Sequence, residues 1–193
     1  MHPPDLIYRI NASDELVFVN DAWNVFAIEN GAADLASPDI LNRSLWTFIT
    51  DETTRFVYTE IVNRTRAGHE VKFEYRCDSP ELRRHLEMLV SPVSDGGIQF
   101  DSRTLSVEKR ESVLHWDRPT SSNKLLHVCS WRNRINIAEK WREVDEAVHH
   151  PDLFKSGIMP MISHGMCEEC YERMVEKIPV RTSANLPRPI ASY

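Results

Sequence analysis

Residues 66–93 read RAGHEVKFEYRCDSPELRRHLEMLVSPV, and this stretch decides which fold we expect for the first half of the chain. Apolar residues occupy alternate positions in two runs, 71–75 and 86–90, and a period of two is typical of strands with one buried face. The residues CDSPE between the runs predict a break. Gly68, just before the first run, is a typical helix stop. The stretch therefore indicates a helix end followed by two strands.

The same patterns predict the elements on either side of this stretch. In chain order we expect two strands within 6–20, three helices within 21–31, 37–49 and 51–68, and three strands at 71–76, 86–90 and 105–107. Asp21 is the expected amino-terminal cap of the first helix, and Gly31 is its expected stop. This order buries one face of an antiparallel sheet under helices. We therefore predict an α+β fold with a five-stranded antiparallel sheet and helices on one face.

Two motifs in this region resemble those of PAS domains. ELVFVNDAWNVFA at 15–27 resembles the step from the second strand to the first helix of that family, and GHEVKFEYR at 68–76 resembles the step into its third strand. The likeness covers about residues 5–111. It implies a PAS-like sensor domain over 1–111 that holds a small ligand between sheet and helices, and it implies that the protein can pair as a homodimer.

Aromatic residues are the expected lining of that ligand pocket. They are Trp23, Trp46, Phe56, Phe73 and Tyr75. The same side chains also suit an ordinary core, because large aromatic residues are mostly buried. A ligand among them would be apolar or aromatic with few polar anchors, and the sequence does not identify it.

Two cofactors of PAS-like proteins are disfavoured by the residues present. Flavin-binding relatives carry a cysteine in a G-x-N-C-R-F-L-Q motif, whereas Cys77, the only cysteine of this region, lies near a strand end. Haem-binding relatives use a histidine on or near the long helix. His69 follows Gly68 at a helix-to-strand turn, where a solvated loop histidine is the simpler interpretation. We therefore expect neither flavin nor haem.

The chain changes character after Arg110. Residues 112–124 are polar, contain a proline and predict a linker. Residues 125–178 form a second region, for which we predict a small helical module with helices over 136–150 and 168–178. Residues 179–193 are rich in proline and predict a flexible tail.

The second region contains a candidate metal site. SHGMCEEC at 163–170 supplies His164, Cys167 and Cys170, and Cys129 lies upstream. Three thiols and one imidazole are enough for a closed tetrahedral zinc site. A region this small would gain folding free energy from the ion.

The same region resembles a small Cys/His zinc-knuckle-like module at the carboxyl end of bacterial sensory and response-regulator proteins. The family pattern is C-S-x-C followed by S-H-G-x-C-x-x-C, and this chain has Arg132 where the second cysteine is usual. Arginine has no lone pair to give to a metal. Either His164 completes a zinc site, or the cysteines are free thiols or small core residues.

Composition and motifs exclude several classes of function. The net charge of −6 argues against binding nucleic acid or an anionic membrane. The amino terminus lacks the regions of a signal peptide, and no apolar run reaches the roughly 20 residues that span a bilayer. We also find no phosphate loop, nucleophile elbow or zinc-protease helix. We therefore expect a cytoplasmic protein that is not an enzyme.

The preferred interpretation is a sensory protein of signal transduction with a protein partner. The first alternative is a redox-responsive thiol protein that uses Cys129, Cys167 and Cys170. The second is a PAS scaffold with no ligand in its pocket.

Overall fold

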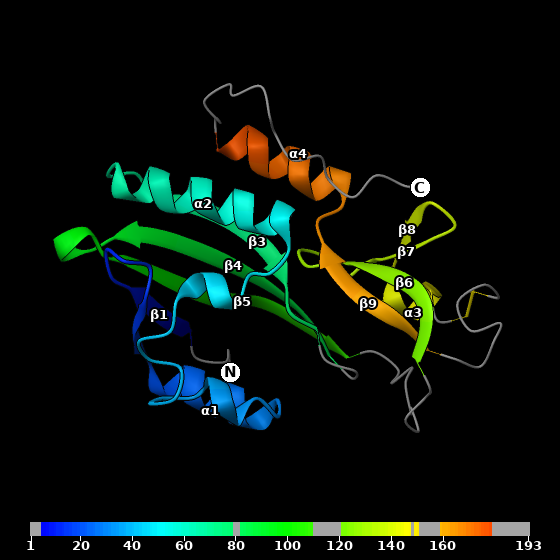
Figure 1. The fold of residues 1–193 in the computed structure, drawn as a ribbon, viewed down its shortest axis with the longest axis horizontal. Coiled ribbons are helices and arrows are strands. Elements are labelled where there is room, and N and C mark those ends of the chain that lie inside the picture. The colour runs from blue at the N-terminus through cyan, green and yellow to red at the C-terminus, as the bar shows by residue number, and fades with distance from the viewer. Residues whose placement is uncertain (1–4, 79–81, 110–120, 148, 151–158, 179–193) are drawn as a thin grey trace.

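The computed structural model describes residues 5–78, 82–109, 121–147, 149–150 and 159–178. These residues form two sheets, one of five strands and one of four, together with helices (Figure 1). The strands are β1 (Leu6–Ile10), β2 (Leu16–Val19), β3 (Val71–Arg76), β4 (Leu82–Pro92), β5 (Ile98–Lys109), β6 (Ser121–Cys129), β7 (Ile135–Ile137), β8 (Lys140–Arg142) and β9 (Met159–Gly165). The helices are α1 (Asp21–Glu29), α2 (Glu52–Arg66), α3 (Val144–Ala147) and α4 (Glu168–Lys177), with 3-10 turns η1 (Ala33–Leu35), η2 (Leu45–Thr47) and η3 (Ser94–Gly96).

The first sheet has the strand order β2-β1-β5-β4-β3, and all its pairings are antiparallel. Phe73 pairs with Met88 and Val71 with Val90, so the apolar positions of the two alternating runs share one buried face. The predicted α+β class with a five-stranded antiparallel sheet is confirmed. The strand order is compatible with the PAS-like sheet expected from the sequence.

Two of the three predicted helices of this region are present. The cap of α1 is Asn20, whose side chain accepts a hydrogen bond from the Trp23 N–H at 3.0 Å, so Asp21 is the first helical residue and not the cap. Asp51 caps α2 in the same way, through the Thr54 N–H at 2.7 Å. Gly68 has φ +90 just after α2, a conformation that favours glycine.

The helix predicted within 37–49 is wrong. At Asn42 and Arg43 its backbone bonds to β2, because the Leu16 N–H donates to the Arg43 carbonyl and the Asn42 N–H donates to the Leu16 carbonyl. Asn42 has a positive φ of 64, which no α-helix contains. Only the 3-10 turn η2 forms within this stretch.

The second region is less helical than predicted. Its sheet has the order β8-β7-β6-β9, with β6 and β9 parallel. The helix predicted over 136–150 is wrong apart from α3, because β7 and β8 form a hairpin whose turn residues Ala138 and Glu139 have φ 49 and 63. The helix predicted at 168–178 is confirmed as α4. The predicted linker lies outside the described residues over 112–120, and β6 begins at Ser121. The predicted tail, 179–193, also lies outside the described residues.

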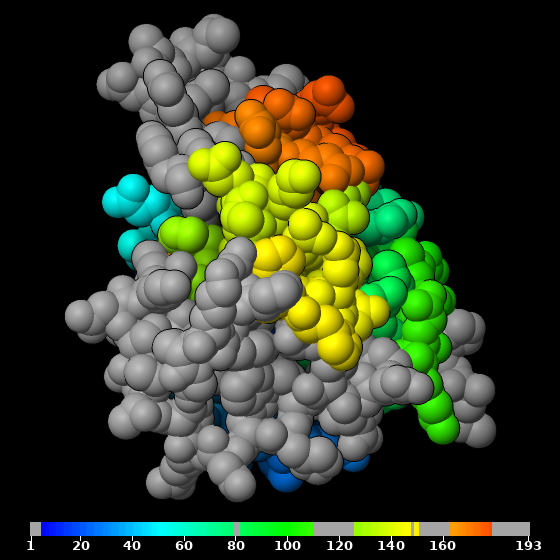
Figure 2. Space-filling view, turned by 90° about the vertical axis from the view of Figure 1, so that its right-hand side faces the viewer, coloured from blue at the N-terminus to red at the C-terminus, as the bar shows by residue number. Residues whose placement is uncertain are grey.

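The two regions share one hydrophobic core. Trp131, Cys129 and Met166 of the second region belong to the same buried cluster as Phe73 and Ile61 of the first. Helix α4 lies beside α2 (Figure 1), and Figure 2 shows α4 and the β7–β8 segment next to β3 and β4. The second region is therefore packed against the first. Among the described residues, no helix combines the length and the apolar character that crossing a membrane requires.

Candidate metal centre and cavities

Three cysteines of the second region come together in the structure. The sulfur atoms of Cys129, Cys167 and Cys170 lie within 4.8 Å of one another, and all three residues are buried. We call them the Cys cluster. The backbone N–H of Cys167 also points to the sulfur of Cys129, at 3.4 Å.

The local fold explains this convergence. Cys129 ends β6, and its register partner on the parallel strand β9 is Gly165, so the chain after β9 passes directly beside Cys129. Cys167 then caps α4, and Cys170 lies in the first turn of that helix. On the other side, the Asn133 N–H donates to the Cys129 carbonyl at 2.7 Å and closes a tight turn. A parallel strand pair, a turn and a helix start thus place the three thiols.

The donor set fits a thiophilic ion such as zinc. Zinc–sulfur bonds of about 2.3 Å place tetrahedral sulfurs roughly 3.8 Å apart, which is within the 4.8 Å limit of the Cys cluster. Hydrogen bonds from the Cys167 and Cys170 thiols lower the pKa of Cys129 and outweigh its burial. One of the three sulfurs therefore has the thiolate character that a metal ligand needs.

The fourth predicted ligand lies elsewhere. His164 is exposed, and its imidazole is outside the group of three sulfurs. Arg132 pairs its guanidinium with a Glu169 oxygen at 2.7 Å. Among the described residues, the protein offers three clustered ligands.

A network of arginines and carboxylates joins the two regions beside the Cys cluster. Arg76 on β3 bonds to Glu143 at 2.6 Å, and Arg134 bonds to the same carboxylate at 2.9 Å. Burial would raise the pKa of Glu143, but the bonds from Arg76 and Arg134 outweigh it and lower the pKa. Arg134 continues to Glu169, at 3.3 Å. The network therefore ties the first sheet to α4 through ionised groups.

Trp131 is the main apolar contact between the regions. Its ring lies 5.5 Å from that of Phe73 and 5.7 Å from that of Tyr58, centroid to centroid. The Arg76 N–H donates to its carbonyl at 2.9 Å. The indole N–H is buried and has no hydrogen-bond acceptor among the described residues. Because Trp131 is two residues from Cys129, the Cys cluster and this contact belong to one turn.

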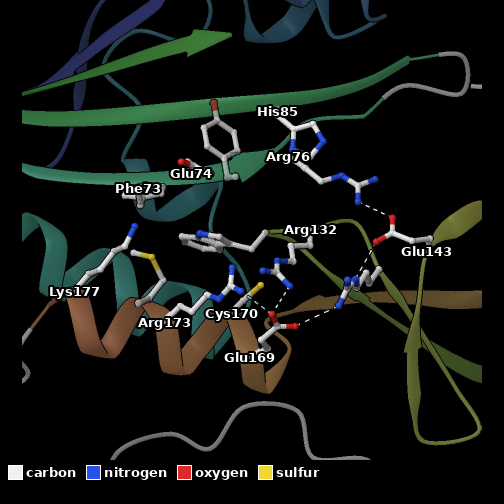
Figure 3. A pocket seen from close by; sticks show the side chains of 14 residues that line it. Phe73, Glu74, Arg76, His85, Arg132, Glu143, Glu169, Cys170, Arg173 and Lys177 are labelled. Atoms are coloured by element: carbon white, nitrogen blue, oxygen red, sulfur yellow. Dashed lines mark hydrogen bonds and ion pairs between the residues drawn. The ribbon is translucent and has the colours of Figure 1, made fainter. Parts of the chain in front are cut away.

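Two cavities adjoin Trp131, and another lies deeper, against Tyr58. The inner cavity, about 190 Å³, lies between the first sheet and the helical segments and is lined by Tyr8, Leu16, Trp23, Leu35, Ile40, Leu45, Phe48, Ile49 and Tyr58. The α2 cavity, about 470 Å³, lies between α2, β3 and Trp131. The α4 cavity, also about 470 Å³, lies between β3, Trp131 and α4 (Figure 3). The two larger cavities are therefore at the junction of the regions.

The predicted pocket residues are divided among these cavities. Trp23 lines the inner cavity, and Phe73 and Tyr75 line both larger ones. Trp46 and Phe56 are partly buried against the core and line none of the three. Sequence reasoning did not assign Trp131 or Tyr58 to a pocket. Trp131 had a signal, since it is an aromatic residue inside the cysteine motif.

Comparisons with known proteins add little to this description. No family model matches the chain, and no curated protein matches it. Among solved structures, the chain is similar to a domain of an HTR-like protein from Haloarcula marismortui ATCC 43049, with 19% identity and a TM-score of 0.38. The match covers 53% of this chain and 99% of that one. A likeness at this level carries no information on function.

Proposed function

We propose that the protein is a non-catalytic sensor of signal transduction in which the Cys cluster holds a metal ion and the junction cavities hold a small ligand. The observation that carries the proposal is the position of Trp131, which is two residues from Cys129 and packs on Phe73 of the first sheet. A bound zinc would supply a rigid centre that ties the three sulfurs together. The turn that presents Trp131 would then be fixed.

A ligand can act through the same contact. Trp131 and Phe73 both line the α2 cavity and the α4 cavity, so a ligand in either one touches both regions. A molecule that binds one arrangement of the regions more tightly than another shifts the population toward it. We propose that this shift is the signal.

The output is proposed to be contact with a protein, including a second copy of the chain. Val17 and Phe18 on β2 and Leu105 and Val107 on β5 are exposed apolar side chains of the first sheet. Exposed apolar surface of this kind is suited to protein contact. The net charge of −6 disfavours nucleic acid as the partner.

Metal content tests the proposal. Elemental analysis of protein purified without added metal should give one zinc per chain, because clustered thiolates bind zinc tightly. Cys129→Ser should lose the zinc and Cys77→Ser should keep it, since Cys77 is outside the Cys cluster. His164→Gln tests whether the imidazole becomes a ligand after a movement. Metal-free protein with four reactive thiols would rule out the metal-bound sensor.

The spacing of the sulfurs also favours a second candidate, a redox-responsive thiol protein. Sulfur atoms within 4.8 Å need only a small movement to form a disulfide. Hydrogen peroxide would take two electrons and two protons from two thiols and be reduced to water. Thiol titration separates the candidates: oxidant alone alters a redox pair, whereas a zinc site protects its sulfurs until a chelator is added.

A further inference from the structure

The α4 cavity has an aromatic floor and a charged rim. Phe73, Tyr75 and Trp131 provide its flat apolar surfaces, and Met174 of α4 closes one side. In Figure 3, Arg132, Arg173 and Lys177 lie on the α4 side of the cavity, opposite the strand that carries Phe73 and Glu74. The cavity therefore combines stacking surface with concentrated charge.

The charge of this lining is opposite to that of the chain. Three carboxylates line the cavity, those of Glu74, Glu143 and Glu169. Five permanent cations line it: Arg76, Arg132, Arg134, Arg173 and Lys177. The lining has an excess of two positive charges, and Asp78, which pairs with Arg76 from outside the lining, reduces the local excess to one, in a protein whose net charge is −6. A cationic cavity on an anionic protein concentrates small anions at that point.

The cations on the α4 side have too few carboxylate partners among the described residues. Arg132 and Arg173 share a single oxygen of Glu169, at 2.7 and 3.0 Å. Lys177 follows Arg173 by four residues on the same helix face and forms no ion pair among the described residues. Like charges at this spacing repel each other. Glu169 thus serves three arginines, Arg132, Arg134 and Arg173, while Lys177 has no carboxylate partner among the described residues, and a second anion would stabilise these cations.

The indole of Trp131, which lines both larger cavities, has an unpaired N–H among the described residues. Trp131 is 6% exposed, and its buried donor has no acceptor among the described residues. A buried donor without a partner costs free energy. The donor is enclosed by protein atoms, so an acceptor on a ligand in the α4 cavity would pair with it only after a rotation of the indole.

We infer that the α4 cavity binds a small anion with a flat aromatic body, such as an aromatic carboxylate. This inference deepens the proposed sensory function, on which it rests, by giving the chemical class of the ligand and its place. The cavity volume of about 470 Å³ lies in the usual range for ligand sites, roughly 300–1,000 Å³, whereas the inner cavity of about 190 Å³ is below it. The α2 cavity lacks the excess of cations, since its lining has Arg76 and Asp51.

Calorimetry on the full-length, zinc-loaded protein tests the inference with indole-3-carboxylate as the probe. Indole-3-carboxamide has the same ring without the charge, and inorganic phosphate has charge without a ring. We expect the carboxylate to bind at least about tenfold more tightly than either, because charge-assisted hydrogen bonds are stronger than neutral ones and stacking adds to them. Equal affinities for the carboxylate and the carboxamide would overturn the inference.

A pair of double variants tests the location. R173Q/K177Q removes two exposed cations of the cavity and should weaken carboxylate binding by about tenfold or more. K109Q/K140Q removes two exposed cations that line none of the cavities, and its affinity should be that of the wild type. Equal loss in both variants would show bulk charge and not a site.

Zinc content, measured on the same samples, separates the inference from the proposed function. Zinc-loaded wild-type protein that binds none of the three probes overturns the anion site and leaves the metal-bound sensor in place. Protein without zinc that binds the carboxylate and loses this in R173Q/K177Q supports the anion site and removes the metal.

Discussion

Truncation of Trp131 to alanine is expected to separate the two regions. Trp131 is only 6% exposed, and its ring contacts those of Phe73 and Tyr58. Its removal takes away roughly 150 Å² of buried apolar surface. At 25 cal/mol per Å², this lowers the free energy of unfolding by about 4 kcal/mol. That figure agrees with the range of about 3–5 kcal/mol for large aromatic residues in cores. No hydrogen-bond loss is added, because the indole N–H has no acceptor among the described residues.

Trp131→Phe is the matched control. Phenylalanine keeps a ring against Phe73 and removes the unpaired N–H, so its expected cost is only about 1 kcal/mol. The free energy of unfolding in urea measures both variants. Hydrogen exchange shows where the structure loosens. The backbone N–H of Arg76 donates to the Trp131 carbonyl and should exchange faster in the alanine variant only.

Two results would refute this reasoning. One is an equal loss of stability in the alanine and phenylalanine variants, which would mean that the ring contacts contribute little. The other is unchanged protection of the Arg76 amide in the alanine variant, which would mean that Trp131 does not hold the second region against β3.

Further perturbations are expected to act on the charge network, the metal site and the backbone. Glu143→Gln should cost about 1–2 kcal/mol at neutral pH, by loss of its bonds to buried Arg76. The pKa of Glu143 is lowered in the fold, so the stability that its carboxylate contributes is complete above pH 4.5 and is lost as the pH falls through the lowered pKa. In urea titrations across that pH range, the free energy of unfolding should therefore fall less in the variant than in the wild type. A chelator should make the Cys cluster sulfurs reactive to a thiol reagent and lower the Tm, and an unchanged Tm would contradict a structural ion. Gly68→Ala should cost about 1–2 kcal/mol because of its φ of +90, whereas Ala67→Gly at φ −76 should cost less.

The first sheet could be predicted because its signals are local. Alternating apolar residues at 71–75 and 86–90 report which face is buried, and the strands they predict are β3 and β4. The helix α2 was equally clear from its apolar stripe and from Gly68. Each of these signals is contained within one element.

The second region was predicted less well because its decisive contacts are distant in sequence. Ile137, Trp141 and Val144 have helical spacing, but they belong to a hairpin and a short helix. The turn residues Ala138 and Glu139 have positive φ, although glycine or asparagine is the usual residue in such a turn. The sulfurs of Cys129 and Cys167 meet only through the parallel pairing of β6 and β9. Composition predicted the ligand types, and topology selected which of them meet.

Arg132 shows how the metal site and the cavity depend on each other. The arginine at this position reaches Glu169, which lies between Cys167 and Cys170 in the first turn of α4. Any movement of that turn when the sulfurs take up an ion also moves the carboxylate that Arg132 and Arg173 share. Arg132 therefore adds a cation to the cavity wall, and Glu169 links the proposed ion site to the proposed anion site at one helical turn. In the proposed sensor, each of the two would change the affinity for the other, and the effect would be reciprocal.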